Sequence, residues 1–184
     1  MRNTSFEKFV IKEQRNPHET SQRNDCMESN KALIEKFYTA FQKLDYATMQ
    51  KCYSDHPVFN DPVFGILEGV EVRAMWEMLC KNAKDFSLTF SNIELLDEEY
   101  ATCDWTACYT FSKTGRKVVN NVKAYMRIQD NSITEHTDYF NFWKWSRQAL
   151  GVSGLLFGWT HYLKSKVRAN AMKNLNNFLT GHTS

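Results

Sequence analysis

The chain has 184 residues, of which 42% are hydrophobic and 14% aromatic, and its formal net charge is +2. This length suits one folded domain with terminal extensions, and the apolar content is ample for a core. The small net charge gives no reason to expect a polyanionic partner for the whole chain, and without a recognition motif we expect no nucleic-acid binding.

The amino-terminal part of the chain changes character near residue 29. The first 28 residues are polar and without steady periodicity, so we expect residues 1–28 to be a mobile leader. From Ser29, which can cap a helix, apolar residues recur at helical spacing. The pattern then predicts a helix from Ser29 through Phe41, a short helix over 46–53, a short strand around Val58 and Phe59, and a third helix over 69–83.

Four segments with alternating hydrophobicity follow, separated by turn residues such as KTGR and QDNS. They are FSLTFSNIELLDE (86–98), YATCDWTACYTFS (100–112), RKVVNNVKAYMRIQD (116–130) and SITEHTDYFNFW (132–143). Helices followed by an antiparallel meander indicate an α+β domain, over residues 29–145, in which a strongly curved antiparallel sheet wraps around the N-terminal helices.

The last strand carries an unusual polar pair. Strand side chains alternate between faces, so His136, Asp138 and Phe140 share one side, while Glu135 and Tyr139 share the other. An ionisable pair is therefore expected to point into an apolar interior. Because Cα atoms two positions apart on a strand are about 7 Å apart, we expect the pair to meet through a water or a ligand rather than a short direct bond.

Residues 146–184 form a helical extension in which apolar residues return every three or four positions. From Tyr139 to the end the chain has no Asp or Glu, but it has Lys and Arg. We favour a role in packing on the α+β domain or closing the open end of its curved sheet. The alternative is that this basic C-terminal helix contacts an anionic membrane surface.

Five cysteines without metal-ligand spacing favour a reducing compartment. The N-terminal segment lacks the apolar stretch of a signal peptide, and the most apolar late stretch is interrupted by glycine and too short for a membrane span. We therefore expect a soluble, cytoplasmic protein.

Three motifs in this order resemble the nuclear transport factor 2-like superfamily, which includes ketosteroid isomerase, limonene epoxide hydrolase and SnoaL-like polyketide cyclases. They are FYTAFQKLDYATMQKCYSDHPVFNDPVFG, EGVEVRAMW and ITEHTDYF, and the resemblance extends from Ala32 to Trp143. It implies a cone-shaped α+β fold with a site on the concave face of the sheet. It does not by itself imply one reaction.

The resemblance to ketosteroid isomerase is incomplete. Asp61 is similar to its general base and Tyr53 to a supporting tyrosine. The two oxyanion-hole donors fall on Phe37 and Ala124, whose side chains cannot donate a hydrogen bond. Tyr38 is one position away, which in a helix turns it about 100° from the site. Steroid isomerisation by that mechanism is therefore disfavoured.

The resemblance to limonene epoxide hydrolase is also partial. Asp138 is similar to one carboxylate of its water-activating Asp-Arg-Asp set, and Phe59 and Asp61 fall on two further water-holding positions. The arginine and the other aspartate fall on Trp105 and Ala107. The SnoaL-like cyclases fit best, because their chemistry needs one acid/base residue in a hydrophobic pocket.

The sequence therefore predicts an enzyme, an isomerase, cyclase or hydrolase, that needs no metal or organic cofactor and acts on a small hydrophobic substrate by general acid/base catalysis. Asp138 and Asp61 are the candidate acid/base pair, with His136 as the polar partner. The predicted pocket residues are Tyr53, Phe59, Trp76, Trp105, Tyr109, Asn120, Met126 and Phe140.

Two alternatives remain open at this stage. The domain could bind a hydrophobic ligand without catalysis. It could also be a scaffold that forms a homodimer through the outer face of the sheet, using Lys123, Tyr125, Arg127 and Tyr139.

Overall fold

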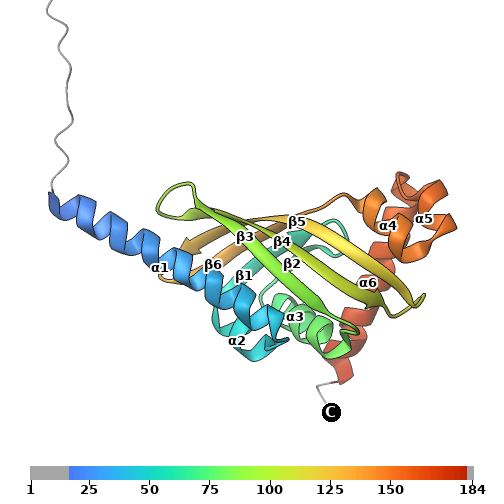
Figure 1. The fold of residues 1–184 in the computed structure, drawn as a ribbon. Helices are drawn as coiled ribbons and strands as arrows, with labels where there is room; N and C mark the ends of the chain where they lie inside the picture. The colour runs from blue at the N-terminus through green and yellow to red at the C-terminus, as the bar shows by residue number, and fades with distance from the viewer. Residues whose placement is uncertain (1–16, 182–184) are drawn as a thin grey trace, which may run out of the picture.

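The computed structural model describes residues 17–181 (Figure 1). The chain begins with α1 (Pro17–Gln42), α2 (Tyr46–Lys51), the hairpin β1 (Tyr53–Asp61) and β2 (Gly65–Glu68), and α3 (Val70–Asn82). The long strands β3 (Ser87–Leu95), β4 (Tyr100–Phe111), β5 (Arg116–Gln129) and β6 (Ser132–Tyr139) follow, and the chain ends with α4 (Phe142–Leu150), α5 (Val152–Phe157) and α6 (His161–Gly181).

The six strands form one sheet in the order β2-β1-β6-β5-β4-β3. The predicted α+β fold is confirmed, and all four predicted sheet segments are strands. The expectation of a purely antiparallel sheet is wrong in one place, because β1 pairs with β6 in parallel. The meander β3 to β6 leaves one edge of β6 free, and β1 pairs with it there. The parallel direction is possible because a long connection, which includes α3 and the strands β3 to β5, separates β1 from β6 in sequence.

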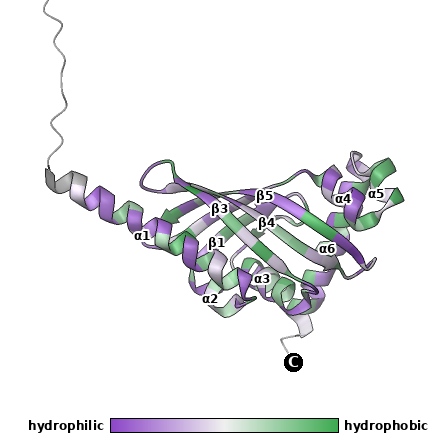
Figure 2. Ribbon diagram, in the orientation of Figure 1, coloured by the Kyte–Doolittle hydropathy of each residue, from purple (hydrophilic) through white to green (hydrophobic). Residues whose placement is uncertain are grey.

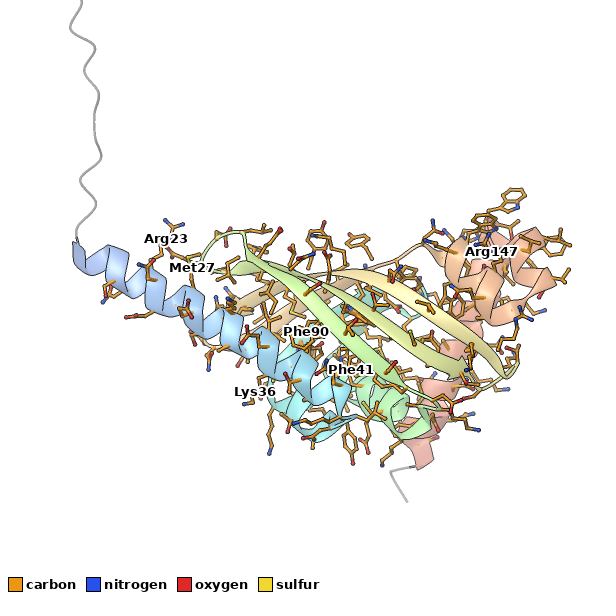
Figure 3. The ribbon with its side chains drawn as sticks, in the orientation of Figure 1. Arg23, Met27, Lys36, Phe41, Phe90 and Arg147 are labelled. Atoms are coloured by element: carbon orange, nitrogen blue, oxygen red, sulfur yellow. The ribbon has the colours of Figure 1, made fainter. Side chains whose placement is uncertain are left out.

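Helices α1 and α3 contribute aromatic side chains to the concave face of the sheet. Phe41 of α1 packs against Trp76 of α3 and Trp105 of β4, with ring centroids 5.1 and 5.8 Å apart. Tyr38 stacks on Phe90 of β3 at 5.5 Å. Figure 3 labels Phe41 and Phe90 where α1 crosses β3. The predicted alternation is present in β5, whereas β4 buries Ala101, Thr102 and Cys103 in succession. The core lies between these helices and the sheet.

Helix α1 begins at Pro17, not at Ser29 as expected. Residues 17–28 are therefore helical, and the expectation of a mobile leader is wrong for them; the rest of that segment, residues 1–16, lies outside the described residues. Proline is well suited to the first turn of a helix. The early part of α1 docks by polar contacts, since Asn30 Nδ2 donates to the Glu98 carbonyl at 2.8 Å and Arg23 lies 3.3 Å from the Glu98 carboxylate. A search for apolar periodicity cannot detect such a helix.

The C-terminal helix α6 packs against α3. Leu175 is fully buried in the main core, and Ala171 and Met172 pack against that core. Near the middle of α6, the Arg168 guanidinium lies so close to Gly65 that any side chain there would collide with it. Because Gly65 opens β2, α6 also reaches the turn between β1 and β2.

Candidate active site

His136 and Asp138 both point into the concave face from β6, and they are only 1% and 3% exposed. His136 Nε2 and Asp138 Oδ1 are 3.1 Å apart. The expectation that they would meet only through a water or ligand is therefore wrong. The Cα spacing is fixed by the strand, but the imidazole extends far enough from its backbone to lean over the shorter aspartate on the same face.

The pair belongs to a chain of buried hydrogen bonds that crosses the concave face. Trp76 Nε1 donates to Tyr53 Oη at 3.0 Å, and Tyr53 Oη lies 2.6 Å from His136 Nδ1. At the other end, Trp105 Nε1 donates to Asp138 Oδ1 at 3.2 Å. The four elements α3, β1, β6 and β4 each contribute to the chain.

This chain has one consistent direction if His136 is neutral. Tyr53 accepts from the indole of Trp76 and donates its own proton to His136 Nδ1. The imidazole then carries its proton on Nε2 and donates it to Asp138 Oδ1, which also accepts from Trp105. The arrangement fixes the orientation of the Asp138 carboxylate. Trp105, which stands where the epoxide hydrolase comparison places an arginine, supplies a neutral donor instead of a positive charge.

Aromatic rings surround His136 closely. The rings of Phe37, Phe59, Tyr53 and Trp76 lie 5.3 to 6.1 Å from the imidazole, measured between centroids. These rings occupy the space in which an open pocket was expected. The predicted pocket walls Tyr53, Phe59, Trp76 and Met126 are 4% exposed or less, so they are core residues in this conformation.

Asp61 is the second carboxylate of the concave face. In the parallel pairing of β1 with β6, Asn60 lies opposite Thr137, which places Asp61 beside Asp138. Burial raises the Asp61 pKa to about 7, although backbone hydrogen bonds to its carboxylate oppose this, and the charge of Asp138 raises it further. A carboxyl group with that pKa can both accept and release a proton near neutral pH.

The same carboxylate also has a structural role. Asp61 Oδ1 accepts hydrogen bonds from the backbone N–H groups of Val63 and Phe64, at 2.9 and 2.5 Å. This is the side-chain-to-backbone bonding of an Asx turn, and it stabilises the turn between β1 and β2. Asp61 is thus held in one orientation by the hairpin that it closes.

Tyr38 also lies in this region, although the comparison with ketosteroid isomerase predicted that its side chain would point away from the site. Its hydroxyl is buried and has no hydrogen-bond partner among the described residues. Burial and the nearby charge of Asp138 raise the Tyr38 pKa well above its ordinary value. The side chain therefore reaches the Asp138 region although the helical offset predicted that it would turn away. Its long side chain, stacked on Phe90, offsets the rotation.

The other predicted pocket residues are dispersed. Asn120 is partly exposed and lies opposite Ala107 in the pairing of β4 with β5. Tyr109 accepts a hydrogen bond from Trp145 Nε1 at 2.9 Å, near Asp61 but away from His136. Phe140 follows β6 and packs in a second cluster with Val118, Phe142, Trp145 and Ala149. The structure therefore does not bring Phe140 to the His136 site, because the chain turns away at the end of β6.

Within residues 17–181, no group of three or more His, Cys, Asp or Glu side chains is placed to hold a metal ion. The same part of the chain contains no helix long and apolar enough to cross a membrane. A shallow surface hollow of about 360 Å³ lies between α1 and α2, lined by residues such as Glu35, Lys36, Thr39 and Asp45. It lies on the outer side of α1, away from His136 and Asp138.

Known structures with this architecture carry several different descriptions. IdmH from Streptomyces antibioticus, a proposed polyketide cyclase, is 19% identical, with a TM-score of 0.56 over 67% of this chain and 99% of its own. An epoxide hydrolase from M. tuberculosis of the LEH-like type is 18% identical, with a TM-score of 0.56 over 73% and 95%. A hypothetical protein from Catenulispora acidiphila with a ketosteroid isomerase-like fold, solved with trimethylamine, is 11% identical, with a TM-score of 0.56 over 64% and 91%.

At these identities the structural similarity shows the fold alone. A comparison with curated proteins gave no significant match. The sequence model of the SnoaL-like domain matches residues 34–136, which include the last part of α1, all of α2, α3 and β1 to β5, and every residue of the hydrogen-bond chain except Asp138. That match spans more than half of the sequence, and the chain therefore belongs to the SnoaL-like domain family.

Proposed function

We propose that the protein is an enzyme that moves protons on a small, mostly apolar substrate by general acid/base catalysis. The observation that carries this proposal is the pair of neighbouring carboxylates on the concave face. One of them, Asp61, has a pKa of about 7, and the other, Asp138, is oriented by His136 and Trp105. Two like carboxylates with different environments suit an acid and a base in one reaction.

Asp61 is the proton-transfer group in this proposal. At neutral pH it is partly ionised, so it abstracts a proton from an acidic carbon and returns it elsewhere on the substrate. Asp138 accepts hydrogen bonds from His136 and Trp105, and its charge adds to the effect of burial in raising the pKa of Asp61. His136 and Tyr53 are positioning residues, because they act on the substrate only through the Asp138 carboxylate.

The unpartnered Tyr38 hydroxyl supports the presence of a ligand near Asp138. A buried hydroxyl without a partner costs about 1–3 kcal/mol, and a substrate oxygen placed beside it would accept its proton. The hydroxyl would then stabilise negative charge that develops on that oxygen during proton abstraction. Since aromatic rings fill the concave face, a substrate has to displace some of them when it binds.

The test measures proton exchange at a carbon next to a carbonyl. The probe is 2-tetralone, a small apolar ketone, in deuterated buffer, with loss of its α-proton signal followed by nuclear magnetic resonance. The proposal expects acceleration that rises with pH through about 7, because Asp61 acts as a base only when ionised. Asp61→Asn should lower the rate by about 10²-fold or more.

Asp97→Asn is the matched control, because Asp97 closes another turn by the same bonds, from Glu99 N and Tyr100 N, on an exposed surface. It should retain the full rate. If Asp61→Asn and Asp138→Asn both exchange 2-tetralone as fast as the unmodified protein, the acid/base assignment is wrong. Unchanged or tighter binding of the probe together with no exchange by any of the proteins would favour the non-catalytic ligand-binding domain.

The homodimeric scaffold is a second candidate, supported by the outer sheet face. Tyr125 and Tyr139 are 43% and 59% exposed there, and their rings pack edge to face at 5.4 Å. The charged neighbours are already paired within the chain, Lys123 with Asp104 and Arg127 with Glu99 and Glu135. Sedimentation at micromolar concentration tests this candidate, and a monomer would remove it.

A further inference from the structure

One end of the molecule concentrates exposed apolar side chains. Six of the sixteen large hydrophobic side chains exposed in the described part of the chain lie within only eleven positions, 152–162. They are Val152, Leu155, Leu156, Phe157, Trp159 and Tyr162, and the last three are 53%, 73% and 71% exposed. We call them the apolar tip. In Figures 1 and 2, α5 lies at the end of the molecule opposite the start of α1, with hydrophobic colouring along its outer side.

Two glycines that lie between the residues of the apolar tip keep its large side chains on the surface. Gly154 and Gly158 are buried against the backbone and hydroxyl of Ser146 in α4, and a side chain at either glycine would collide with Ser146. The Ser146 hydroxyl, itself fully buried, donates to the Trp143 carbonyl at 3.1 Å. Helix α5 therefore buries its smallest residue and exposes its largest ones. Helix α5 cannot rotate about its axis to bury its large apolar side chains without losing the close contact of Gly154 and Gly158 with Ser146.

Basic residues flank the tip in the sequence, and no acidic residue follows Asp138. The sequence has no Asp or Glu after Asp138, whereas Lys144, Arg147, Lys164 and Lys166 lie in α4 and the first turns of α6. Figure 3 labels Arg147 at this end. Arg147 lies over the ring of Trp143 at 5.0 Å, and Lys166 over that of Tyr162 at 5.9 Å, so cations and aromatic rings share one surface.

We propose that the apolar tip docks on the surface of a lipid bilayer that contains anionic phospholipids. The tip would enter the boundary between head groups and acyl chains, with the surrounding lysines and arginines on the phosphates. Tryptophan and tyrosine are favoured at that boundary, because their rings are apolar at one end and polar at the other. This inference does not depend on the proposed function.

The chemistry of the surface favours a bilayer over the other possible occupants. A protein interface or a second copy of this chain would be expected to bury few lysines, since lysine is depleted from interfaces. A nucleic acid would use the cations but would leave Val152, Leu155 and Leu156 in water. An anionic bilayer would bind both the apolar side chains of the tip and the lysines and arginines beside them. The tip would lie in the membrane surface rather than span it, consistent with the absence of a spanning helix in residues 17–181.

The test is co-sedimentation of the full chain with vesicles. The vesicles are made of phosphatidylcholine alone or of phosphatidylcholine with about 30% phosphatidylserine. We expect binding to the anionic vesicles that weakens as salt is added. The triple variant Leu156→Ser, Phe157→Ser, Trp159→Ser should lose it, and Lys164→Gln with Lys166→Gln should weaken it by roughly 30-fold, since each basic residue near an anionic surface strengthens binding about fivefold.

Val70→Ser with Leu96→Ser is the matched control, because these side chains are 66% and 59% exposed but lie in α3 and in the turn after β3. That variant should bind like the unmodified protein. Vesicles with brominated acyl chains add a second measurement, since they should quench Trp159 emission, and Trp159→Phe should remove most of the quenching. Trp76 and Trp105 lie within or against the core and serve as the unquenched background. Trp143 is 38% exposed beside the tip, so it is replaced by phenylalanine in both proteins that are compared.

Three results would overturn the proposal. The first is that the protein does not bind anionic vesicles. The second is that the Val70→Ser, Leu96→Ser control loses as much vesicle binding as the triple variant. The third is that the protein sediments as a dimer, which the triple variant dissociates, and does not bind vesicles. Circular dichroism of each variant should match that of the unmodified protein, because all substituted residues are exposed.

Discussion

The buried Asp61 carboxyl makes a specific prediction about stability and pH. Its pKa is about 7 in the folded protein and close to the ordinary 3.8 in the unfolded chain. Between these values the folded state holds a proton that the unfolded state has released. The unfolding free energy should therefore be highest at low pH, fall as pH rises from about 4 to about 7, and stay level above that, as far as Asp61 determines it.

The substitution Asp61→Asn should remove this dependence. Asparagine keeps an oxygen that accepts the Val63 and Phe64 N–H bonds, but it cannot ionise. From a pH of about 4.5 to the Asp61 pKa of about 7 is about 2.5 pH units, which at 1.36 kcal/mol each corresponds to roughly 3 kcal/mol. The variant should gain about that much stability relative to the unmodified protein when both are moved from a pH of about 4.5 to about 8.5.

Urea unfolding of both proteins at these two pH values measures the difference directly. Asp97→Asn is again the control, because Asp97 bonds two backbone N–H groups at 2.8 and 2.7 Å but is exposed, and those bonds lower its pKa. Its contribution has the opposite sign, since it is present above the unfolded pKa and lost as pH falls. A relative gain below about 1 kcal/mol for Asp61→Asn would refute the argument that burial controls this carboxyl.

Two further substitutions test the hydrogen-bond chain and the last helix. Tyr53→Phe should destabilise the protein by about 1–3 kcal/mol in urea unfolding, because it leaves His136 Nδ1 and an indole N–H buried without partners, whereas the exposed Tyr125→Phe should stay within about 0.5 kcal/mol. Leu175→Ala should cost about 2–5 kcal/mol in the same assay, because this side chain is fully buried in the core, and the exposed Asn176→Ala should be nearly neutral. If Tyr53→Phe lowers the unfolding free energy no more than Tyr125→Phe, or Leu175→Ala no more than Asn176→Ala, the packing described above is contradicted.

Much of the candidate site followed from local patterns. Alternation along a strand is set by the backbone, so the inward direction of His136 and Asp138 could be predicted from the order of residues alone. The resemblance in turn singled out Asp61, since the turn after β1 occurs at a fixed place in the fold. The direct His136–Asp138 bond could not be predicted, because it depends on how the rings of Phe37, Phe59 and Trp76 confine the imidazole.

The sequence by itself determined the α+β class, the four long strands and the inward face of β6, because hydrophobic periodicity is a local property of the chain. Only the tertiary structure decided the start of α1, the parallel pairing of β1 with β6 and the filling of the concave face. These depend on contacts between residues far apart in sequence, such as Asn30 with Glu98 and Tyr53 with His136. The outward face of α5 belongs to the same group, since close packing on Ser146 overrides the tendency of large apolar side chains to be buried.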